Sequence, residues 1–255
     1  MTPAVRSERF QRTGVNKEGG TSETQFVSVV VPNLNKGGYV REAIESILHQ
    51  SYENFELLFV DNGSTDGSRE IAKEYSERDR RVVLHLEPRR GSSHALNKGL
   101  SESRGDLITF LGSDDICNEH RLREQVRLLA KNPEIGGCHS NGWIIDASGK
   151  PTGEIYHRDI VPLPAEGYDG NIFHQLLRRN FVIGGSVMFR RGCVKGNSSM
   201  LASNWVRTGT LTCESRIGIS SLTSRMPSMD TEFSSPKVQN GVQYRFISVL
   251  STKNA

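Results

Sequence analysis

The sequence predicts an α/β fold with a mainly parallel β-sheet flanked by helices. Two features support this fold class. Short apolar runs of strand length alternate with segments whose apolar residues recur at helical spacing, from about residue 26 to residue 130. A polar loop follows each apolar run, and crossover units of this kind place their strands parallel to one another.

Four strands and four helices are expected in this part of the chain. The strands are runs dominated by Val, Leu, Ile and Phe, and they cover residues 27–31, 55–60, 82–86 and 106–111. The helices alternate with them and cover residues 39–50, 68–77, 93–103 and 118–130. The first helical segment shows the pattern clearly, because its apolar residues are Val40, Ala43, Ile44, Ile47 and Leu48.

Composition and charge exclude several classes of protein. The net charge of +3 over 255 residues gives no strong electrostatic case for a nucleic-acid partner. The four cysteines show no C-x-x-C spacing, which favours reduced thiols over a disulfide framework or a zinc site. The apolar run at residues 26–31 is too short for a membrane span or a signal peptide. We therefore expect a soluble, cytoplasmic protein, with residues 1–25 as a disordered polar leader.

The four loops that follow the expected strands carry most of the groups that could bind a ligand. They are PNLNKGG at residues 32–38, DNGSTDGS at residues 61–68, PRRGSS at residues 88–93 and GSDD at residues 112–115. In a parallel sheet these loops share one edge, the edge where α/β proteins bind ligands. Their amides, carboxylates, guanidinium pair and backbone N–H groups suit a nucleoside diphosphate with a bridging divalent cation.

Each loop also has a purely structural interpretation. Asp114 and Asp115 end an apolar strand, and they could either cap a helix in a solvated loop or bind a divalent cation shared with a phosphate. Asp66 or Ser64 could cap the helix after the second strand. The arginine pair at residues 89–90 could be solvated. The joint order of the four loops along one sheet favours a ligand site.

Three segments of the chain carry a resemblance to a known family. They are VSVVVPNLNKGGYVREAIESILHQSYENFELLFVDNGSTDGS from residue 27, GSSHALNKGLSESRGDLITFLGSDD from residue 91 and FVIGGSVMFRR from residue 181. From about residue 26 to residue 190 the chain resembles family 2 glycosyltransferases of the GT-A fold. The resemblance implies a Rossmann-like sheet and an enzyme that moves a sugar from a nucleotide diphosphate sugar to a saccharide or lipid-linked acceptor.

The resemblance also implies how and where the reaction takes place. The family usually inverts the anomeric configuration and usually uses Mg²⁺ or Mn²⁺. The resemblance further implies a role in cell-surface polysaccharide or glycolipid synthesis. For a lipid-linked acceptor, it implies peripheral contact at the inner face of the membrane, although no basic amphipathic helix is evident in the sequence. Residues 26–135 would form the nucleotide-sugar-binding half, and residues 136–190 would begin the acceptor-binding half.

The resemblance assigns the nucleoside of the donor to Asn33, Asp61 and Asn62. The family often has Asp at the position of Asn62, where it accepts the ring N–H of uracil. An amide oxygen can also accept that bond, so a UDP-sugar is the favoured donor. The guanidinium of Arg90, or of its neighbour Arg89, is expected near the diphosphate.

The resemblance places the metal beside the fourth strand. The D-x-D motif of the family maps to Gly112-Ser113-Asp114, so that Gly112 replaces the first Asp. Asp114 keeps the position that holds Mg²⁺ or Mn²⁺, and Ser113 and Asp115 complete the expected donor-binding loop. The family's base, which deprotonates the acceptor hydroxyl, lies in a later E-D-W-D segment. This sequence lacks such a segment, so no catalytic residue is assigned.

The last quarter of the chain departs from the family pattern. Residues 191–255 contain 12 Ser and 6 Thr but three acidic residues, without clear periodicity. When the coding sequence is read in the frame that starts one base earlier, the codons that span residues 204–206 must encode Leu and then Gly. In the same frame, the codons through residues 207–210 can encode E-D-W-D. We therefore predict a frameshift near Arg190, a truncated acceptor half, a poorly ordered tail, and a chain that folds poorly or is inactive.

Two other functions fit parts of the sequence. A non-catalytic sugar-nucleotide-binding module is the literal interpretation of a chain with donor loops and no base. A nucleotidyltransferase would have a glycine-rich basic loop after the first strand, whereas residues 33–38 offer one lysine and two glycines. In the acceptor half, His139, Asn141 and Trp143 could line a sugar subsite, although packing is the alternative for Trp143.

Overall fold

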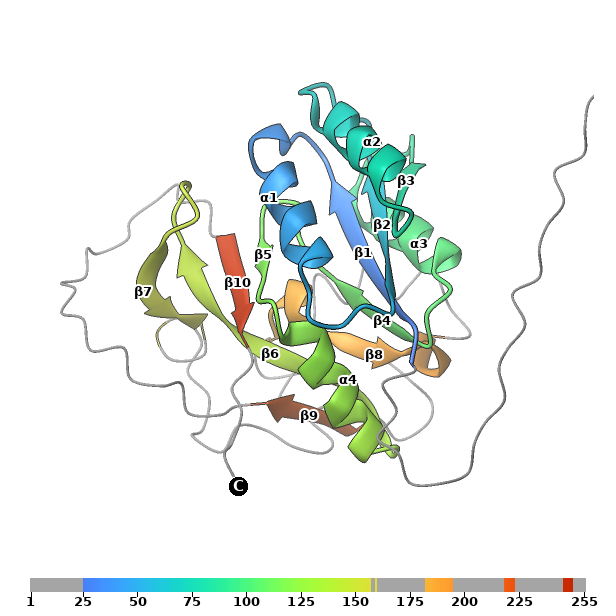
Figure 1. Ribbon diagram of the computed structural model, residues 1–255, viewed down its shortest axis with the longest axis vertical. Helices are drawn as coiled ribbons and strands as arrows, with labels where there is room; N and C mark the ends of the chain where they lie inside the picture. Colours follow the sequence, from blue (N-terminus) through green and yellow to red (C-terminus); the bar gives the residue numbers. More distant parts are fainter. Residues whose placement is uncertain (1–24, 157–158, 160–181, 195–217, 223–244, 250–255) are drawn as a thin grey trace, which may run out of the picture.

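In the part of the chain that the structure describes, a ten-stranded sheet with helices on both faces forms the body of the protein (Figure 1). The structure is a computed structural model that describes residues 25–156, 159, 182–194, 218–222 and 245–249. It confirms the α/β class and the mainly parallel sheet flanked by helices. Most of the expected leader and most of the tail after residue 194 lie outside the described residues.

Strands and helices alternate strictly in the first half of the chain. In order they are β1 (Val27–Asn33), α1 (Gly37–Leu48), β2 (Phe55–Asp61), α2 (Ser68–Arg78), β3 (Val82–Leu86), α3 (Ser92–Glu102) and β4 (Leu107–Phe110). The apolar pattern predicts all seven, with ends that differ from the observed ends by at most two residues.

The remaining elements are shorter and less regular. They are β5 (Ile116–Cys117), α4 (Arg121–Lys131), β6 (Ile135–Ile145), β7 (Pro151–Ile155), the 3-10 turns η2 (Gly184–Ser186) and η3 (Arg191–Val194), β8 (Met188–Arg190), β9 (Gly218–Leu222) and β10 (Arg245–Val249). The helix expected from residue 118 begins at Arg121. A turn precedes it, in which the Arg121 N–H donates to the Asn118 carbonyl oxygen at 3.0 Å.

The strand order creates a switch point at the middle of the sheet. The order is β3-β2-β1-β4-β8-β6-β10-β5, and β7 and β9 each pair with β6. β1 pairs in parallel with β2 on one side and with β4 on the other, while β8 runs antiparallel to both β4 and β6. The strand order therefore reverses between the adjacent strands β1 and β4. Open α/β sheets bind ligands at such a reversal.

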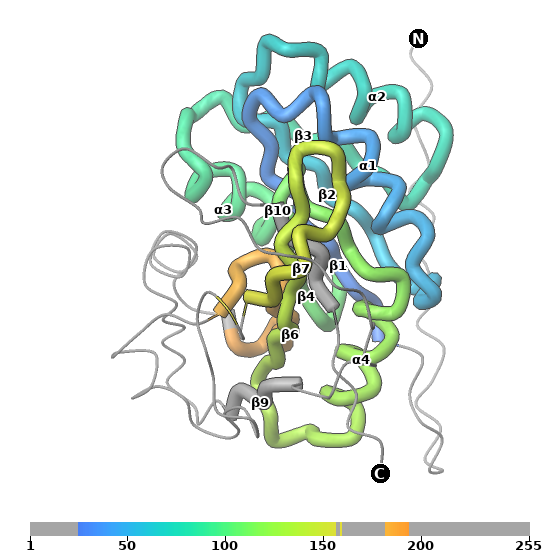
Figure 2. Tube along the Cα trace, turned by 90° about the vertical axis from the view of Figure 1, so that its left-hand side faces the viewer, coloured from blue at the N-terminus to red at the C-terminus, as the bar shows by residue number. Residues whose placement is uncertain are grey.

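Alternating residues of the central strand supply two hydrophobic cores. Val29 and Val31 belong to the core that also contains buried residues of α1, α2 and α4. Val30 belongs to the second core, which contains buried residues of α3. Figure 2 shows α3 on one side of the sheet and α1, α2 and α4 on the other. Because both faces are covered, the central strands are mostly apolar on both faces, as buried parallel strands are.

The second half supports the sheet with antiparallel strands. β6 and β7 form a hairpin whose turn is fixed by Asp146, because its Oδ1 accepts the N–H groups of Ser148 at 2.8 Å and Lys150 at 3.0 Å. In the predicted non-family tail, β9 pairs in parallel with β6 and β10 pairs antiparallel to it. The origin of the tail stays a prediction.

Two further expectations concern thiols and membranes. Cys117, Cys138 and Cys193 are reduced thiols, and Cys213 lies outside the described residues. Burial raises the pKa of the Cys138 thiol to about 12, so this thiol is inert at neutral pH. In the part of the chain that the structure describes, no helix has the length and apolar character needed to cross a membrane.

Candidate functional site

The candidate site lies at the carboxyl ends of β1, β2, β3 and β4. Asn33 is the last residue of β1 and Asp61 is the last residue of β2, and the parallel register places the two side by side. Both side chains are buried, with 2% and 1% of their surface exposed. The structure therefore brings together two of the residues expected to bind the donor.

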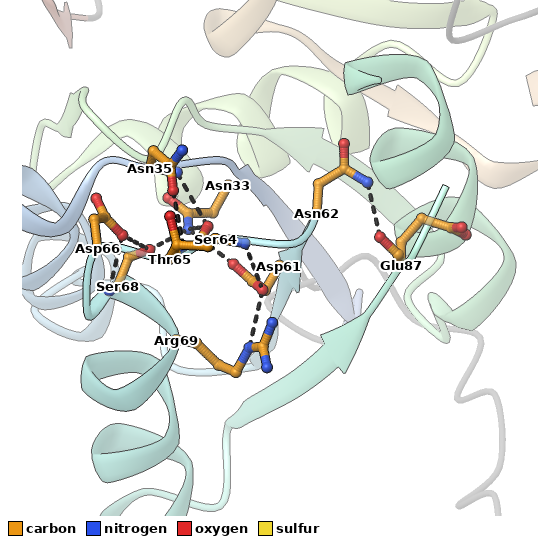
Figure 3. A network of polar contacts seen from close by, with 10 residues as sticks. All are labelled: Asn33, Asn35, Asp61, Asn62, Ser64, Thr65, Asp66, Ser68, Arg69 and Glu87. Carbon is orange, nitrogen blue, oxygen red and sulfur yellow. Dashed lines mark hydrogen bonds and ion pairs between the residues drawn. The ribbon is translucent and has the colours of Figure 1, made fainter. Parts of the chain in front are cut away.

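A hydrogen-bond network joins Asn33 and Asp61 to two serines (Figure 3). Asn33 Nδ2 donates to Asp61 Oδ1 at 3.2 Å, and it lies 2.9 Å from Ser64 Oγ and from Ser68 Oγ. Asn33 Oδ1 is buried and has no hydrogen-bond partner among the described residues. A buried amide oxygen without a donor is an acceptor that a ligand N–H or hydroxyl can use.

Asp61 is held in its ionised form. Its Oδ2 accepts the Ser64 N–H at 3.2 Å and the Arg69 Nε–H at 3.1 Å. Burial alone would raise the pKa of Asp61, but the hydrogen bonds from Ser64, Asn33 and Arg69 together hold this pKa below its usual value of 3.8. The site therefore contains a fixed negative charge beside the Asn33 amide.

The loop between β2 and α2 owes its shape to Asp66 and two glycines. Gly63 and Gly67 both have a φ of 86°, which only glycine adopts freely. Asp66 Oδ1 accepts the Ser68 N–H at 3.1 Å, and Asp66 Oδ2 accepts the Gly37 N–H at 2.7 Å. Asp66 therefore shapes the turn before α2 and ties it to the start of α1.

Asn62 points away from Asn33 and Asp61 (Figure 3). Its Nδ2 donates to the carbonyl oxygens of Glu87 at 2.8 Å and Arg89 at 2.7 Å, and its Oδ1 accepts the Gly91 N–H at 2.7 Å. The buried amide thus fixes the loop between β3 and α3. Its oxygen keeps one lone pair, which a ligand N–H can use.

The two arginines of this loop have different surroundings. Arg89 Nε and Nη2 donate to the two carboxylate oxygens of Glu87, each at 2.8 Å. The Arg89 guanidinium lowers the pKa of Glu87 to about 2. Arg90 is exposed and makes no hydrogen bond or ion pair with any other residue that the structure describes. Arg90 is therefore the guanidinium that a diphosphate can recruit at the lower cost.

The acidic loop after β4 is a tight turn. Its Asp115 N–H donates to the Gly112 carbonyl oxygen at 3.0 Å, and Ser113 is buried with 3% of its surface exposed. Asp114 Oδ2 lies 2.7 Å from Lys36 Nζ, which comes from the loop after β1. The salt bridge thus connects the loops of two adjacent strands across the switch point.

The geometry of this loop suits a divalent cation. A Cβ added to Gly112 would lie 3.1 Å from Asp114 Oδ1 and 2.6 Å from Asp115 Oδ2, so both carboxylates converge on this glycine. Hard carboxylate oxygens are ligands that Mg²⁺ and Mn²⁺ favour. Asp114 already has a positively charged partner, because the Lys36 ammonium lies beside its carboxylate. Among the described residues, no three His, Cys, Asp or Glu side chains are grouped to hold a metal on their own.

A buried arginine, Arg121, connects the strand before the acidic loop to the segment around Gly185. The Arg121 side chain is fully buried at the start of α4. Its Nη2 donates to Thr109 Oγ1 at 2.8 Å and to the Phe110 carbonyl oxygen at 3.1 Å, and its Nη1 donates to the Gly185 carbonyl oxygen. A Cβ on Gly185 would lie 3.4 Å from Asp115 Oδ2. Arg121 thus joins β4 to the segment that packs beside the carboxylates.

Sequence reasoning missed both Lys36 in this role and Arg121. The position of Lys36 in a loop after a strand was a signal, but its pairing with Asp114 depends on β1 and β4 being neighbours. Arg121 gave no signal, because a charged residue in an amphipathic helix is expected on the solvent face.

The residues considered for the acceptor lie apart from this network, on β6. His139 is buried, with 1% of its surface exposed, whereas Asn141 and Trp143 are half-buried. Asn141 and Trp143 are paired in register with residues of β10, and Trp143 also with β7. Their role in sugar binding stays a prediction.

The fold defines a class of protein, the GT-A glycosyltransferases. The fold is similar to the crystal structure of residues 1–349 of TarS from S. aureus, with a TM-score of 0.56 and 19% identity over 76% of this chain and 58% of that one. It is also similar to the mannosyltransferase PcManGT from Pyrobaculum calidifontis in complex with GDP-Man and Mn²⁺, with a TM-score of 0.53 and 18% identity over 81% of this chain and 60% of that one.

The chain belongs to glycosyl transferase family 2, whose family model matches residues 28–196. It is 45% identical over 121 residues to the glycosyltransferase GlyG of Streptococcus pneumoniae, a match that covers 46% of this chain and 40% of GlyG. It is 36% identical over 110 residues to TuaG of Bacillus subtilis, a glycosyltransferase assigned to teichuronic acid biosynthesis; this match covers 43% of this chain and 44% of TuaG. The chain thus spans less than half of the length of these two relatives.

Proposed function

We propose that this chain derives from, and retains the donor-binding half of, a glycosyltransferase that moves a sugar from a nucleotide diphosphate sugar to a saccharide or lipid-linked acceptor. A UDP-sugar is the favoured donor, and cell-surface polysaccharide or glycolipid synthesis is the favoured setting. The observation that supports the proposal most directly is that Asn33 ends β1, Asp61 ends β2 and Asp114 lies in the loop after β4. These three strands are adjacent in the sheet, in the order β2-β1-β4.

The nucleoside is proposed to bind where β1 and β2 end. The unpaired Asn33 Oδ1 and the ionised Asp61 offer acceptors to the N–H and hydroxyl groups of a nucleoside. Asn62 is proposed to shape this part of the site by holding the loop between β3 and α3, with one lone pair left for the ring N–H of the base. Structures of TarS in complex with UDP and of PcManGT in complex with GDP-Man show that the fold accommodates such ligands in other proteins.

The diphosphate is proposed to bind between Arg90 and the acidic loop. Asp114 would hold Mg²⁺ or Mn²⁺, with Asp115 and Ser113 beside it and with phosphate oxygens as further ligands. When bound, the metal supplies Lewis-acid stabilisation of the leaving diphosphate. Arg90 adds a guanidinium, which matches phosphate oxygens in geometry and charge.

The second half of the reaction lacks its expected base. An inverting transfer needs a carboxylate that deprotonates the acceptor hydroxyl, and the sequence contains no E-D-W-D segment. We propose that this segment is encoded in a shifted reading frame, so that the chain as written binds donors without transferring sugar. A non-catalytic sugar-nucleotide-binding module is the alternative, and the same missing base supports it. For a lipid-linked acceptor, the working position would be the inner face of a membrane.

A thermal-shift titration with UDP, GDP and dTDP, each with and without Mn²⁺, tests the donor site. We expect UDP to raise the melting temperature, and Mn²⁺ to enlarge this rise, because a ligand that binds only the folded state stabilises it. A hundredfold excess of ligand over its Kd corresponds to about 2.7 kcal/mol. If none of the three nucleotides stabilises the chain in the presence of Mn²⁺, both the transferase and the binding-module proposals fail.

A further inference from the structure

Lys36 is held in a position from which it reaches across the candidate site. Its carbonyl oxygen accepts the N–H groups of Tyr39 at 2.8 Å and Val40 at 3.1 Å, and the next residue, Gly37, donates its N–H to Asp66 at 2.7 Å. These bonds fix the backbone just before α1. The side chain then extends to the neighbouring loop, where its ammonium lies 2.7 Å from Asp114 Oδ2.

The electrostatics of the acidic loop explain this contact. The carboxylates of Asp114 and Asp115 both approach Gly112 closely, and two carboxylates that share a small space repel each other. The ammonium of Lys36 offsets this repulsion. Lysine suits the task because its charge is compact and sits on a flexible stem that can move to another anion. The contact is partly exposed, with 27% and 20% of the two side-chain surfaces accessible, so solvent and ligands can reach it.

We propose that Lys36 is a built-in counter-ion that couples metal binding to nucleotide binding. This inference rests on the proposed function. Lys36 neutralises Asp114 while the site is empty, and it must leave Asp114 when a divalent cation binds, because two positive charges within a few ångströms of each other repel. The diphosphate of the donor then gives the displaced ammonium a new anionic partner.

The consequence is a defined pattern of affinities. A divalent cation alone competes with Lys36 for Asp114 and binds weakly. A cation that arrives with a nucleoside diphosphate displaces Lys36 onto phosphate oxygens and binds more tightly. The ratio of these two affinities is the coupling between metal and nucleotide, and linkage requires that the metal strengthen nucleotide binding by the same factor.

The test measures Mn²⁺ binding directly by electron paramagnetic resonance, in which the signal reports free Mn²⁺. The Kd for Mn²⁺ is determined with and without saturating UDP for the full chain, for Lys36→Met and for Lys36→Arg. Lys98→Met is the matched control, because it removes a lysine–carboxylate pair of the same length, Lys98 with Glu102 at 2.7 Å, on α3 outside the site. Circular dichroism verifies that each variant is folded.

We expect Lys36→Met to bind Mn²⁺ alone about tenfold more tightly than the unmodified chain, and to lose about tenfold in coupling to UDP. Lys36→Arg, which keeps the charge, should keep most of the coupling, and Lys98→Met should match the unmodified chain. Coupling in Lys36→Met equal to that of the unmodified chain would overturn the inference and leave the proposed function intact. If no variant binds Mn²⁺ or UDP, the proposed function fails, and the inference fails with it.

Discussion

At the scale of single residues, Asp61 is the clearest link between local structure and function. It is a buried carboxylate that remains ionised because Ser64, Asn33 and Arg69 donate hydrogen bonds to it. The same carboxylate lies beside the unpaired Asn33 oxygen at the end of the neighbouring strand. Its charge therefore serves the stability of the loop and the proposed nucleoside site at once.

Substitution of Asp61 by Asn should reduce both stability and nucleotide binding. Loss of the charge-assisted hydrogen bonds is expected to cost about 1.5–3 kcal/mol of the free energy of unfolding at pH 7. Because the folded-state pKa of Asp61 is lowered, its stabilising effect is present above the usual value of 3.8 and is lost as the pH falls through the folded pKa. The deficit of Asp61→Asn should therefore shrink in acid, as denaturant titrations from pH 7 to pH 2 can measure.

Asp79→Asn provides the control for this prediction. Asp79 also accepts hydrogen bonds from an arginine, Arg81, which lower the pKa of Asp79, but it lies at the opposite edge of the sheet, before β3. Loss of the Asp79 carboxylate should lower the free energy of unfolding at pH 7, and this deficit should also shrink in acid. It should leave UDP binding unchanged. Equal loss of UDP binding in both variants would show that Asp61 acts only through stability.

The sequence identifies individual site residues where their loop and the family resemblance are informative together. The polar-loop pattern locates the loops that contain Asn33, Asp61 and Asp114, and the resemblance to the family selects these three residues within them. The Lys36–Asp114 pair could not be predicted in the same way, because these residues are far apart in the chain. Lys36 Nζ and Asp114 Oδ2 lie 2.7 Å apart because β1 and β4 are adjacent strands in the sheet.

At the scale of secondary-structure elements, the site depends on how closely α3 approaches β1. A Cβ added to Gly99 of α3 would lie 2.2 Å from Val30 Cγ1 and 3.2 Å from Val30 Cβ. Val30 is a fully buried, β-branched residue of the second core, so it has no room to move aside. Gly99 therefore allows the helix to sit directly on the strand that ends at Asn33.

Gly99→Ala is predicted to lower the free energy of unfolding by about 1–3 kcal/mol, because overpacking a filled core outweighs the better helix propensity of alanine. Gly38→Ala in α1 is the matched control, since nothing lies within 4 Å of a Cβ added there. This control should be neutral or stabilising by up to about 1 kcal/mol. Equal stability of the two variants in urea titrations would contradict the packing argument.

Local sequence patterns predict elements better than they predict the order of elements. The apolar runs of β1 to β4 and the helical spacing of α1 to α3 are local signals, and the structure confirms them within two residues. The two-residue strand β5 is too short to give a pattern. The position of β8 between β4 and β6 depends on pairings between residues about 50 to 80 positions apart, such as Cys138 with Met188 and Leu107 with Arg190, which no local pattern contains.

At the scale of the whole molecule, the chain combines a regular first half, in which strands and helices alternate, with a tail of different character. The family model ends at residue 196, and the predicted out-of-frame segment that permits E-D-W-D lies beyond it, outside the described residues. β9 and β10 pair with β6, so two segments of this tail extend the sheet. The proposed donor site and the segment that permits E-D-W-D therefore lie in different parts of the chain.

The reading-frame proposal predicts a lesion in the coding DNA. Sequencing from codon 184 to codon 239 should show one inserted or deleted base near codon 190, and its correction should restore the E-D-W-D segment. The corrected chain should release UDP from a UDP-sugar, while the present chain should bind the donor without turnover. A confirmed frame with stop codons in the alternative frame would refute the proposal and favour the binding module.

The central claim is that a nucleoside diphosphate and a divalent cation bind together at the ends of β1, β2 and β4. Calorimetric titration of UDP into the chain, with and without Mn²⁺, tests this claim most directly when Asp114→Asn is measured alongside. We predict that Mn²⁺ strengthens UDP binding at least about tenfold in the unmodified chain, and that Asp114→Asn abolishes this gain while it still binds UDP weakly. UDP binding that is absent, or that responds equally to Mn²⁺ in both proteins, would contradict the account.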